Sequence, residues 1–265
     1  MCSVVILRRP DHAWPVLIAA NRDEMADRPW LAPARHWPER AHICAGLDEL
    51  AAGTWLGMND HGVVAGVLNR VNTLGPAPGR RSRGELPLEA LEHADAPSAA
   101  AALADLNPEA YRPFNLFIVD SRDAYWVRLT DASEAAGTGC RRVSVAPLPL
   151  GLSMITAYDC NDEGSPRIHR SRPQFAAAPA PEPERGDWSA WISILTDRRH
   201  DPGQGPGGAM NVYTDTGFGT VSCSLIALPA QITRRIRPIW LFAAGRSGEA
   251  DFQPVLPSPS SGAIV

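Results

Sequence analysis

The residue best placed to do chemistry is the cysteine at position 2. If Met1 is removed, the α-amine of Cys2 lies within reach of its own thiol. An amine with a reference pKa of about 7.7–8.0 can accept the thiol proton at neutral pH, which would make Cys2 a nucleophile activated by its own terminus. The alternative is a structural cysteine at the start of a strand, because free cysteine packs as a small hydrophobic side chain.

A run of four polar residues, Asn21-Arg22-Asp23-Glu24, directly follows an apolar segment at 16–20. Turn residues at 8–12 favour a hairpin between segments 2–7 and 16–20, which would bring the polar run beside Cys2. Asp23 would then orient a protonated amine, and Arg22 would hold a substrate carboxylate through two hydrogen bonds, with Asn21 and Glu24 beside it. The alternative is an exposed strand end closed by a local salt bridge.

Two further groups are candidates for binding a substrate. Arg83 belongs to an arginine cluster that precedes a predicted helix, so it either belongs to a plain helix start or binds an anion at the positive end of that helix. Ser82 and Glu85 have the spacing of a helix capping box. Trp30, Trp37 and Trp55 either fill the core or wall a pocket, and Trp55 is the preferred wall residue.

Composition excludes several classes of function. The chain has no lysine, which excludes P-loop, kinase and Schiff-base chemistry. Its five cysteines contain no C-x-x-C pair and its seven histidines have no metal-ligand spacing, so we predict neither a disulfide framework nor a metal site. A net charge of -4 argues against nucleic acid. Since no secretory pattern and no long apolar run occur, we expect a cytoplasmic protein without stable membrane insertion.

Strands, helices, strands, helices and strands follow one another along the chain. We expect strands at 2–7, 16–20, 54–59, 63–69, 115–120, 125–129, 221–228 and 238–242, with a further strand ending near 153, and helices at 85–93, 98–106, 167–177 and 188–195. This order favours sheets stacked between helices and not strict βαβ alternation. We predict one domain over residues 1–252 and a loosely ordered Pro- and Ser-rich tail over 253–265.

Met1-Cys2 followed by Asn21-Arg22-Asp23-Glu24 resembles the signature of the NRDE family, also called the Transport and Golgi Organization 2 family. Colinear matches extend the resemblance to about residue 228: Gly53-Thr54-Trp55-Leu56-Gly57, Arg83-Gly84-Glu85-Leu86, Phe114-Asn115-Leu116, Gly151-Leu152-Ser153 and Phe218-Gly219-Thr220. That family in turn resembles the choloylglycine-hydrolase and penicillin-acylase branch of the N-terminal-nucleophile hydrolases. The resemblance implies an α+β fold, a four-layer αββα sandwich with antiparallel sheets. It implies that Cys2 is the nucleophile and that Asp23 is the acidic residue ending the second strand.

The same resemblance gives Asn69, at the end of a predicted hairpin, the role of a donor to the oxyanion, for which a side-chain amide is suited. A turn-capping asparagine is the alternative. The chain departs from many relatives at Met154, where they have asparagine, and at Val221, where they have arginine. Both departures weaken the case for amide hydrolysis, and nearby Thr156, Tyr158 or Asp159 are the residues that would have to compensate.

Two functions therefore stay open. The first is a Cys2-dependent hydrolase or acyltransferase that acts on a linear amide in a small-molecule substrate and requires no cofactor. The second is a non-catalytic carrier with haem as its ligand, because members of the family are associated with haem trafficking. The candidate axial ligands of haem are His36, His42, His61 and the cysteines, and the sequence does not favour one of them over the others. Neither the substrate nor the oligomeric state follows from the sequence.

Overall fold

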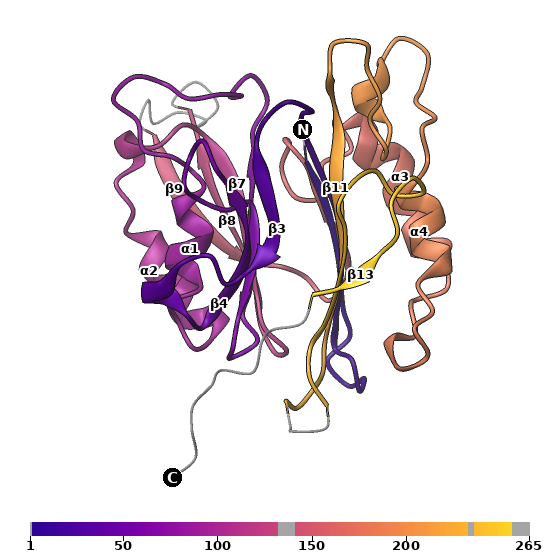
Figure 1. The fold of residues 1–265 in the computed structure, drawn as a ribbon, viewed down its shortest axis with the longest axis horizontal. Helices are drawn as coiled ribbons and strands as arrows, with labels where there is room; N and C mark the ends of the chain where they lie inside the picture. Colours follow the sequence, from indigo (N-terminus) through magenta and orange to yellow (C-terminus); the bar gives the residue numbers. More distant parts are fainter. Residues whose placement is uncertain (1, 132–140, 233–235, 256–265) are drawn as a thin grey trace.

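Two antiparallel sheets face each other, and each carries helices on its outer side (Figure 1). The computed structural model describes residues 2–131, 141–232 and 236–255. One sheet has six strands in the order β10 (Gly151–Ile155), β1 (Ser3–Arg8), β2 (Val16–Met25), β11 (Phe218–Leu228), β12 (Ile239–Ala243) and β13 (Gln253–Pro254). The other has seven in the order β3 (Trp30–Ala34), β4 (Ile43–Asp48), β5 (Leu56–Asn59), β6 (Val64–Asn69), β7 (Phe114–Val119), β8 (Ala124–Thr130) and β9 (Arg142–Pro147).

Four α-helices complete the described layers. The seven-stranded sheet is covered by α1 (Glu85–Ala90) and α2 (Ala96–Ala104), and the six-stranded sheet by α3 (Pro166–Ala177) and α4 (Ser189–Leu195). The fold is therefore the expected αββα sandwich. Short 3-10 turns lie at Pro38–Arg40, Pro108–Ala110, Pro183–Arg185 and Pro206–Gly208.

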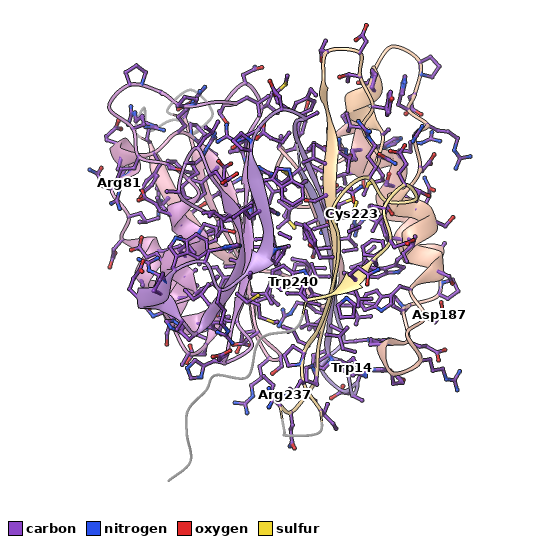
Figure 2. All side chains as sticks on the ribbon, viewed as in Figure 1. Trp14, Arg81, Asp187, Cys223, Arg237 and Trp240 are labelled. Carbon is purple, nitrogen blue, oxygen red and sulfur yellow. The ribbon has the colours of Figure 1, made fainter. Side chains whose placement is uncertain are left out.

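Three apolar clusters hold the layers together, and strand alternation decides which cluster each side chain joins. In β1, Val4 and Ile6 point into the space between the sheets, whereas Val5 packs under α3 and α4. Trp240, labelled in Figure 2, also belongs to the inter-sheet cluster. A further cluster packs α1 and α2 on the seven-stranded sheet. Each sheet is thus buried on both faces, and the core is divided among three interfaces.

Strand β2 is longer than the sequence predicted and contains the whole polar run of residues 21–24. It continues because it is a central strand: Ser3 of β1 pairs with Asn21, and Thr220 of β11 pairs with Asp23. A bulge between Thr220 and Ser222 shifts the register, so that Ser222 lies opposite Arg22 and Val221 is the extra residue. The expected strand bounds of 16–20 are therefore too short, since two neighbouring strands satisfy the backbone of the polar run.

The starts of the first two α-helices differ in how they are capped. Helix α2 begins at Ala96, two residues before the expected start, with Pro97 in its first turn and the Asp95 side chain accepting a hydrogen bond from the Ser98 N–H at 2.8 Å. The predicted capping box before α1 is wrong: the N-cap is Gly84, whose N–H donates to Ser82 Oγ at 3.1 Å. Glu85 is bound instead by Arg81 on the helix exterior, with 2.7 Å between Nε and Oε1.

The predicted tail begins with an ordered stretch. Gln253 and Pro254 pair with β12, and the Val255 N–H donates to the Trp240 carbonyl at 2.7 Å. Residues 256–265 lie outside the described residues, so the rest of that prediction is untested. Within the described ranges, no helix has the length and apolar character needed to cross a membrane.

Candidate functional site

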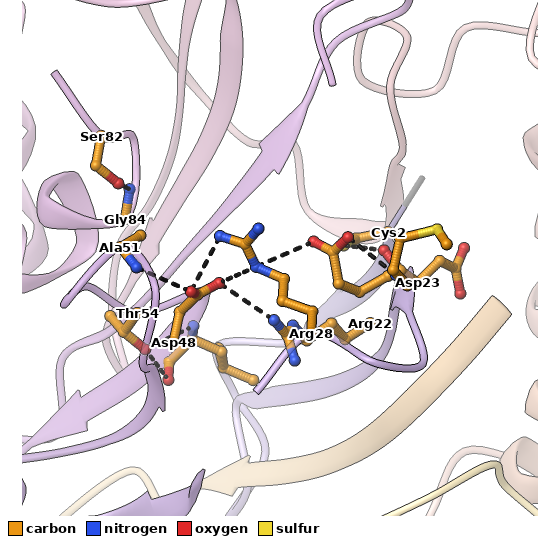
Figure 3. Close-up of polar contacts among 12 residues, drawn as sticks. Cys2, Arg22, Asp23, Arg28, Asp48, Ala51, Thr54, Ser82 and Gly84 are labelled. Carbon is orange, nitrogen blue, oxygen red and sulfur yellow. Dashed lines mark hydrogen bonds and ion pairs between the residues drawn. The ribbon is translucent and has the colours of Figure 1, made fainter. Parts of the chain in front are cut away.

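Cys2 lies just before β1 at the edge of the inter-sheet space, half-buried against the inter-sheet cluster. Its thiol is 3.9 Å from the backbone carbonyl oxygen of Asp23, to which it donates (Figure 3). The thiol also lines a narrow pocket of about 340 Å³ between the sheets. The other wall residues are Ser3, Val4, Ala20, Asn21, Arg22, Trp55, Leu56, Val67, Leu68, Phe117, Ser222 and Ser224.

Strand alternation divides the polar run of β2 between the two faces of its sheet. Arg22 points into the inter-sheet space, where Glu24 shares its face. Asn21 and Asp23 point the other way, toward the layer of α3 and α4. The structure therefore brings Arg22 to the thiol's side of the sheet and places the Asp23 carboxylate on the opposite side.

Arg22 is a buried cation on the pocket wall, with 5% of its side chain exposed. Its guanidinium lies 4.0 Å from the centre of the Trp55 ring, and its Nη2 is 3.4 Å from Asp48 Oδ2. Arg28 binds both oxygens of the same carboxylate more closely, at 2.7 and 3.0 Å. The Arg22 Nη1 atom is buried and has no hydrogen-bond partner within the described part of the chain. Burial lowers the pKa of Arg22, and an unsatisfied buried donor costs about 1–3 kcal/mol.

Asp23 is bound at both carboxylate oxygens. Arg167, from the first turn of α3, donates to Oδ2 at 2.8 Å, and Thr220 of β11 donates to Oδ1 at 2.7 Å. The side chains of Arg167 and Asp23 are 3% and 0% exposed. The sequence interpretation missed Arg167 altogether. Thr220 was present in a quoted motif, and the register of β11 against β2 is the signal that would have paired it with Asp23.

Asn21 contributes to the fold on the same face. Its Nδ2 donates to the Leu195 carbonyl at the end of α4 and to the Met210 carbonyl, at 3.2 and 2.9 Å. The first of these bonds satisfies a carbonyl group that the end of a helix leaves without a partner. Asn21 anchors α4 to the sheet, and its side chain does not point toward the thiol.

The electrostatics of the thiol are set first by burial, which raises the pKa of Cys2; the charge of Asp23 raises it further and that of Arg22 lowers it. Burial also raises the pKa of Cys44 and Cys160 to about 11 and that of Cys223 to about 12. All four described cysteines are thus protonated at neutral pH. Selective reactivity at Cys2 therefore needs a proton acceptor.

Trp55 occupies the predicted place in the pocket wall. Its ring lies edge-on to Trp30 at 5.8 Å, and Trp30 lies 5.9 Å from Phe242 in the facing sheet. Glycine is needed at position 46, because a Cβ there would lie 2.3 Å from the Trp55 ring. Trp37 packs instead on the cluster beneath α1 and α2.

Asn69 and Arg83 do not line this pocket. Asn69 is half-buried at the end of β6. Arg83 donates through Nη1 to Thr73 Oγ1 and to the Pro113 carbonyl, both at 3.0 Å. Burial, followed by the charge of Arg112, lowers the pKa of Arg83 to about 10. Arg83 therefore holds the loop after β6, and Asn69 stays a prediction as an oxyanion donor.

A second polar feature lies where segment 156–159 meets the seven-stranded sheet. Asn115 donates through Nδ2 to the carbonyls of Thr156 and Tyr158 at 2.9 and 2.7 Å. Its Oδ1 accepts from Arg70 Nη1 at 2.9 Å and from Trp126 Nε1 at 3.1 Å. Asn115 thereby joins the two sheets beside the site.

The residues considered as compensating for Met154 have other partners. Asp159 is paired with Arg70, 2.7 Å from its Nη1, and with Arg128. Thr156 Oγ1 lies 3.1 Å from Ser165 Oγ. Thr156, Tyr158, Ser165, Pro166, Arg167, Gln204, Gly207 and Gly208 line a second pocket of about 480 Å³. Met154 is fully buried beneath α3 and α4.

Neither pocket has a histidine in its wall. His36 is hydrogen-bonded to the Ala32 carbonyl, His42 is paired with Glu92, and His61 is exposed. Among the residues that the structure describes, no group of three His, Cys, Asp or Glu side chains is arranged to hold a metal ion. The narrow inter-sheet pocket offers haem one sulfur ligand, Cys2, and little room, so its described walls do not fit a macrocycle.

The architecture is that of the N-terminal-nucleophile hydrolases. The chain is similar to the Caenorhabditis elegans ortholog of N-acylethanolamine-hydrolyzing acid amidase, with a TM-score of 0.54 at 12% identity, over 85% of this chain and 92% of that one. It is also similar to a variant of the conjugated bile acid hydrolase from Clostridium perfringens, with a TM-score of 0.54 at 12% identity, over 96% and 92% of the two chains. At such identities the likeness shows the fold alone.

The family follows from sequence. The model of the Transport and Golgi organisation 2 family matches residues 1–184, and the chain belongs to that family. The Transport and Golgi organization 2 homolog of Mus musculus is 37% identical over 78 residues. That match spans 28% of this chain and 28% of the length of the curated relative.

Proposed function

We propose that the chain is a Cys2-dependent hydrolase or acyltransferase that acts on a linear amide bond. The observation that carries the proposal is the position of the Cys2 thiol in the wall of the inter-sheet pocket, on the same side of the sheet as the unpartnered Arg22 Nη1. The solved structures with this fold are described as an acid amidase and a conjugated bile acid hydrolase, which supports a hydrolase.

The chemistry begins with removal of Met1, which makes the Cys2 amine the chain terminus. That amine takes the thiol proton, and the thiolate sulfur attacks the carbonyl carbon of the amide. The carbon–nitrogen bond then breaks, the ammonium returns its proton to the departing amine, and a thioester remains on Cys2. Water, or an acceptor amine or alcohol, attacks the thioester and restores the thiol.

The pocket suggests the class of substrate. Its wall is apolar at Val4, Leu56, Leu68 and Phe117, and cationic at Arg22. An acyl group with an apolar portion and an anionic group would fill the first part and satisfy the arginine donor. We therefore propose a small amide that carries an acidic group. Asn69 is retained as a proposed oxyanion donor and Asp23 as the proposed partner of the terminal amine.

A carrier without turnover is the second candidate, and three observations favour it over the enzyme. The Asp23 carboxylate is already bound by Arg167 and Thr220, burial raises the pKa of the Cys2 thiol, and Met154 offers no amide. In such a carrier haem would bind outside the inter-sheet pocket, because the described walls of that pocket do not fit a macrocycle. For either function we propose a cytoplasmic location, in which the four described cysteines, all free, would stay reduced.

The test compares Cys2→Ser with Cys160→Ser, another half-buried cysteine that packs on the same cluster but does not line the pocket. Intact mass first establishes whether Met1 is absent. We expect Cys2→Ser to lose all turnover of acidic N-acyl amides and Cys160→Ser to keep it. Turnover by Cys2→Ser at the wild-type rate would overturn the proposal that Cys2 is the nucleophile. A haem absorption band that is present in wild type and in both variants, without turnover in any of them, would support the carrier.

A further inference from the structure

A buried ion pair lies directly behind the candidate nucleophile. The Asp23 backbone carbonyl accepts the thiol of Cys2, while its carboxylate is held from the other face of the sheet. Arg167 donates to one carboxylate oxygen and Thr220 to the other, at 2.8 and 2.7 Å. One residue of β2 thus connects the thiol with α3 and β11.

Arg167 is itself held in place. Its Nη2 donates to the Gly207 carbonyl at 3.0 Å. It lies in the first turn of α3, which is capped by Ser165, whose side chain accepts from the Ile168 N–H at 3.4 Å. Thr220 is fixed as well, because its Oγ1 accepts from the Val212 N–H at 2.9 Å. Both groups that orient Asp23 are therefore preorganised.

We propose that Arg167 is a positioning residue for the Cys2 site: it holds the Asp23 carboxylate in one orientation and balances its charge. This inference rests on the proposed function, because it assumes that the terminal amine must be neutral to accept the thiol proton. Arg167 does not line the thiol's pocket, so it acts through Asp23 and not on the substrate.

The physical reason is the effect of an unbalanced buried carboxylate. Such an anion favours the protonated forms of both the terminal amine and the thiol, so it raises both pKa values. The guanidinium of Arg167 offsets this field. With Arg167 present, the amine can lose its proton near its ordinary pKa of about 7.7–8.0. Without Arg167, the amine would stay protonated at neutral pH and would not accept the thiol proton.

The experiment measures the rate of Cys2 alkylation by iodoacetamide between pH 5 and 10, with peptide mapping on the full chain. In Arg167→Met we expect the rising limb to move upward by about one pH unit, so that the rate at pH 7 falls about tenfold. Arg167→Lys, which keeps the charge, should return the limb toward its wild-type position. An unchanged profile in Arg167→Met overturns the proposal.

Two further variants keep the test decisive. Arg141→Met removes another arginine with a mostly buried side chain, bound to Glu109 and the Tyr111 carbonyl outside the site, and should leave the profile unchanged; a matching shift there would overturn the assignment. If Arg167→Met does not fold, the double variant Asp23→Asn/Arg167→Met, in which both charges are removed, is used.

In this double variant the alkylation rate of Cys2 should rise at the same pH as in wild type or at a lower pH. A rise at higher pH would contradict the proposal that Arg167 balances the charge of Asp23. Wild-type Cys2 that reacts no faster than Cys160 at pH 7 would count against the proposed function, while the comparison of Arg167 variants still tests positioning.

Discussion

Two arginines flank the candidate nucleophile in different ways. Arg167 is bound closely to a buried carboxylate. Arg22 shares Asp48 with Arg28, which takes the shorter contacts, and keeps one N–H without a partner in the described structure. The first arrangement fixes a geometry, and the second leaves hydrogen-bonding capacity on the pocket wall. This difference assigns positioning to Arg167 and ligand contact to Arg22.

Replacement of Arg22 by glutamine should make the Cys2 thiol less acidic. The Arg22 charge lowers the pKa of the thiol, so its removal raises that pKa and the thiolate forms at higher pH. We expect alkylation of Cys2 at pH 8 to slow by about three- to tenfold, since loss of a nearby cation moves a pKa by up to about one unit or more. Arg128→Gln is the matched control, because Arg128 also stacks on a tryptophan, 4.7 Å from the centre of Trp126, but lies outside the pocket wall. Equal rates in Arg22→Gln and wild type would contradict this electrostatic role.

At the scale of elements, the sheets are joined beside the site by Asn115 on β7. Its amide nitrogen donates two hydrogen bonds to carbonyls of segment 156–158, and its amide oxygen accepts hydrogen bonds from Arg70 and Trp126. Asn115 is fully buried, and its bonds to Arg70 and to the Thr156 carbonyl are buried as well, so these two partners would be left without access to water if the amide is lost. The Asn115 amide therefore holds the segment that follows β10 to the opposite sheet, together with Arg128 of β8, which binds Asp159.

We expect Asn115→Leu to lower the free energy of unfolding by about 3 kcal/mol or more, because several buried polar groups lose a partner at about 1–3 kcal/mol each. Asn107→Leu is the control. Its side chain caps the short turn at Pro108–Ala110 by accepting from the exposed Glu109 N–H at 2.9 Å, and its loss should cost about 1 kcal/mol. Denaturant unfolding followed by circular dichroism measures both. A cost for Asn115→Leu no larger than for Asn107→Leu would show that the cross-sheet bonds contribute little.

Most elements were predictable because their apolar periodicity or turn residues are strong, as in the hairpin of β5 and β6. Strands β3, β4 and β9 and the two-residue β13 were missed. Pro33 interrupts β3, Gly46 weakens the pattern of β4, and β9 is an edge strand with exposed ends. The sequence placed Cys2 beside the polar run correctly. It did not predict that Asp23 meets Arg167, because a contact between residues 144 positions apart depends on tertiary packing.

At the scale of the whole molecule, one apolar cluster between the sheets draws on both halves of the chain. Phe117 of the seven-stranded sheet shares it with Ile18 and Ile226 of the six-stranded sheet. Gly66 makes room for the Phe117 ring, since a Cβ there would lie 2.5 Å from it. Neither sheet has a complete core without the other, which favours one cooperative unit.

Hydrogen exchange tests this unity. We expect the slowest amides of β1 and β2 to lose protection at the same denaturant concentration as those of β6 and β7, because opening one sheet exposes the shared cluster. Phe117→Ala should lower both sets together, by about 3–5 kcal/mol. Leu103→Ala in α2, which faces the outer cluster, provides a comparison for a change outside the interface. Protection lost in two separate steps in the wild-type protein would mean two independent units.

The alternation of side chains along β2 has a consequence for how this family can change over time. In its four-residue signature, positions 21 and 23 contact one set of neighbours and positions 22 and 24 contact another. Position 23 is tied to Arg167 and Thr220 behind the sheet, whereas position 22 is tied to Asp48 and Trp55 in front of it. Correlated substitution among related sequences should therefore divide into two sets that skip alternate positions. Drift in one set can alter what the pocket accepts while the anchoring of the nucleophile behind it is inherited unchanged.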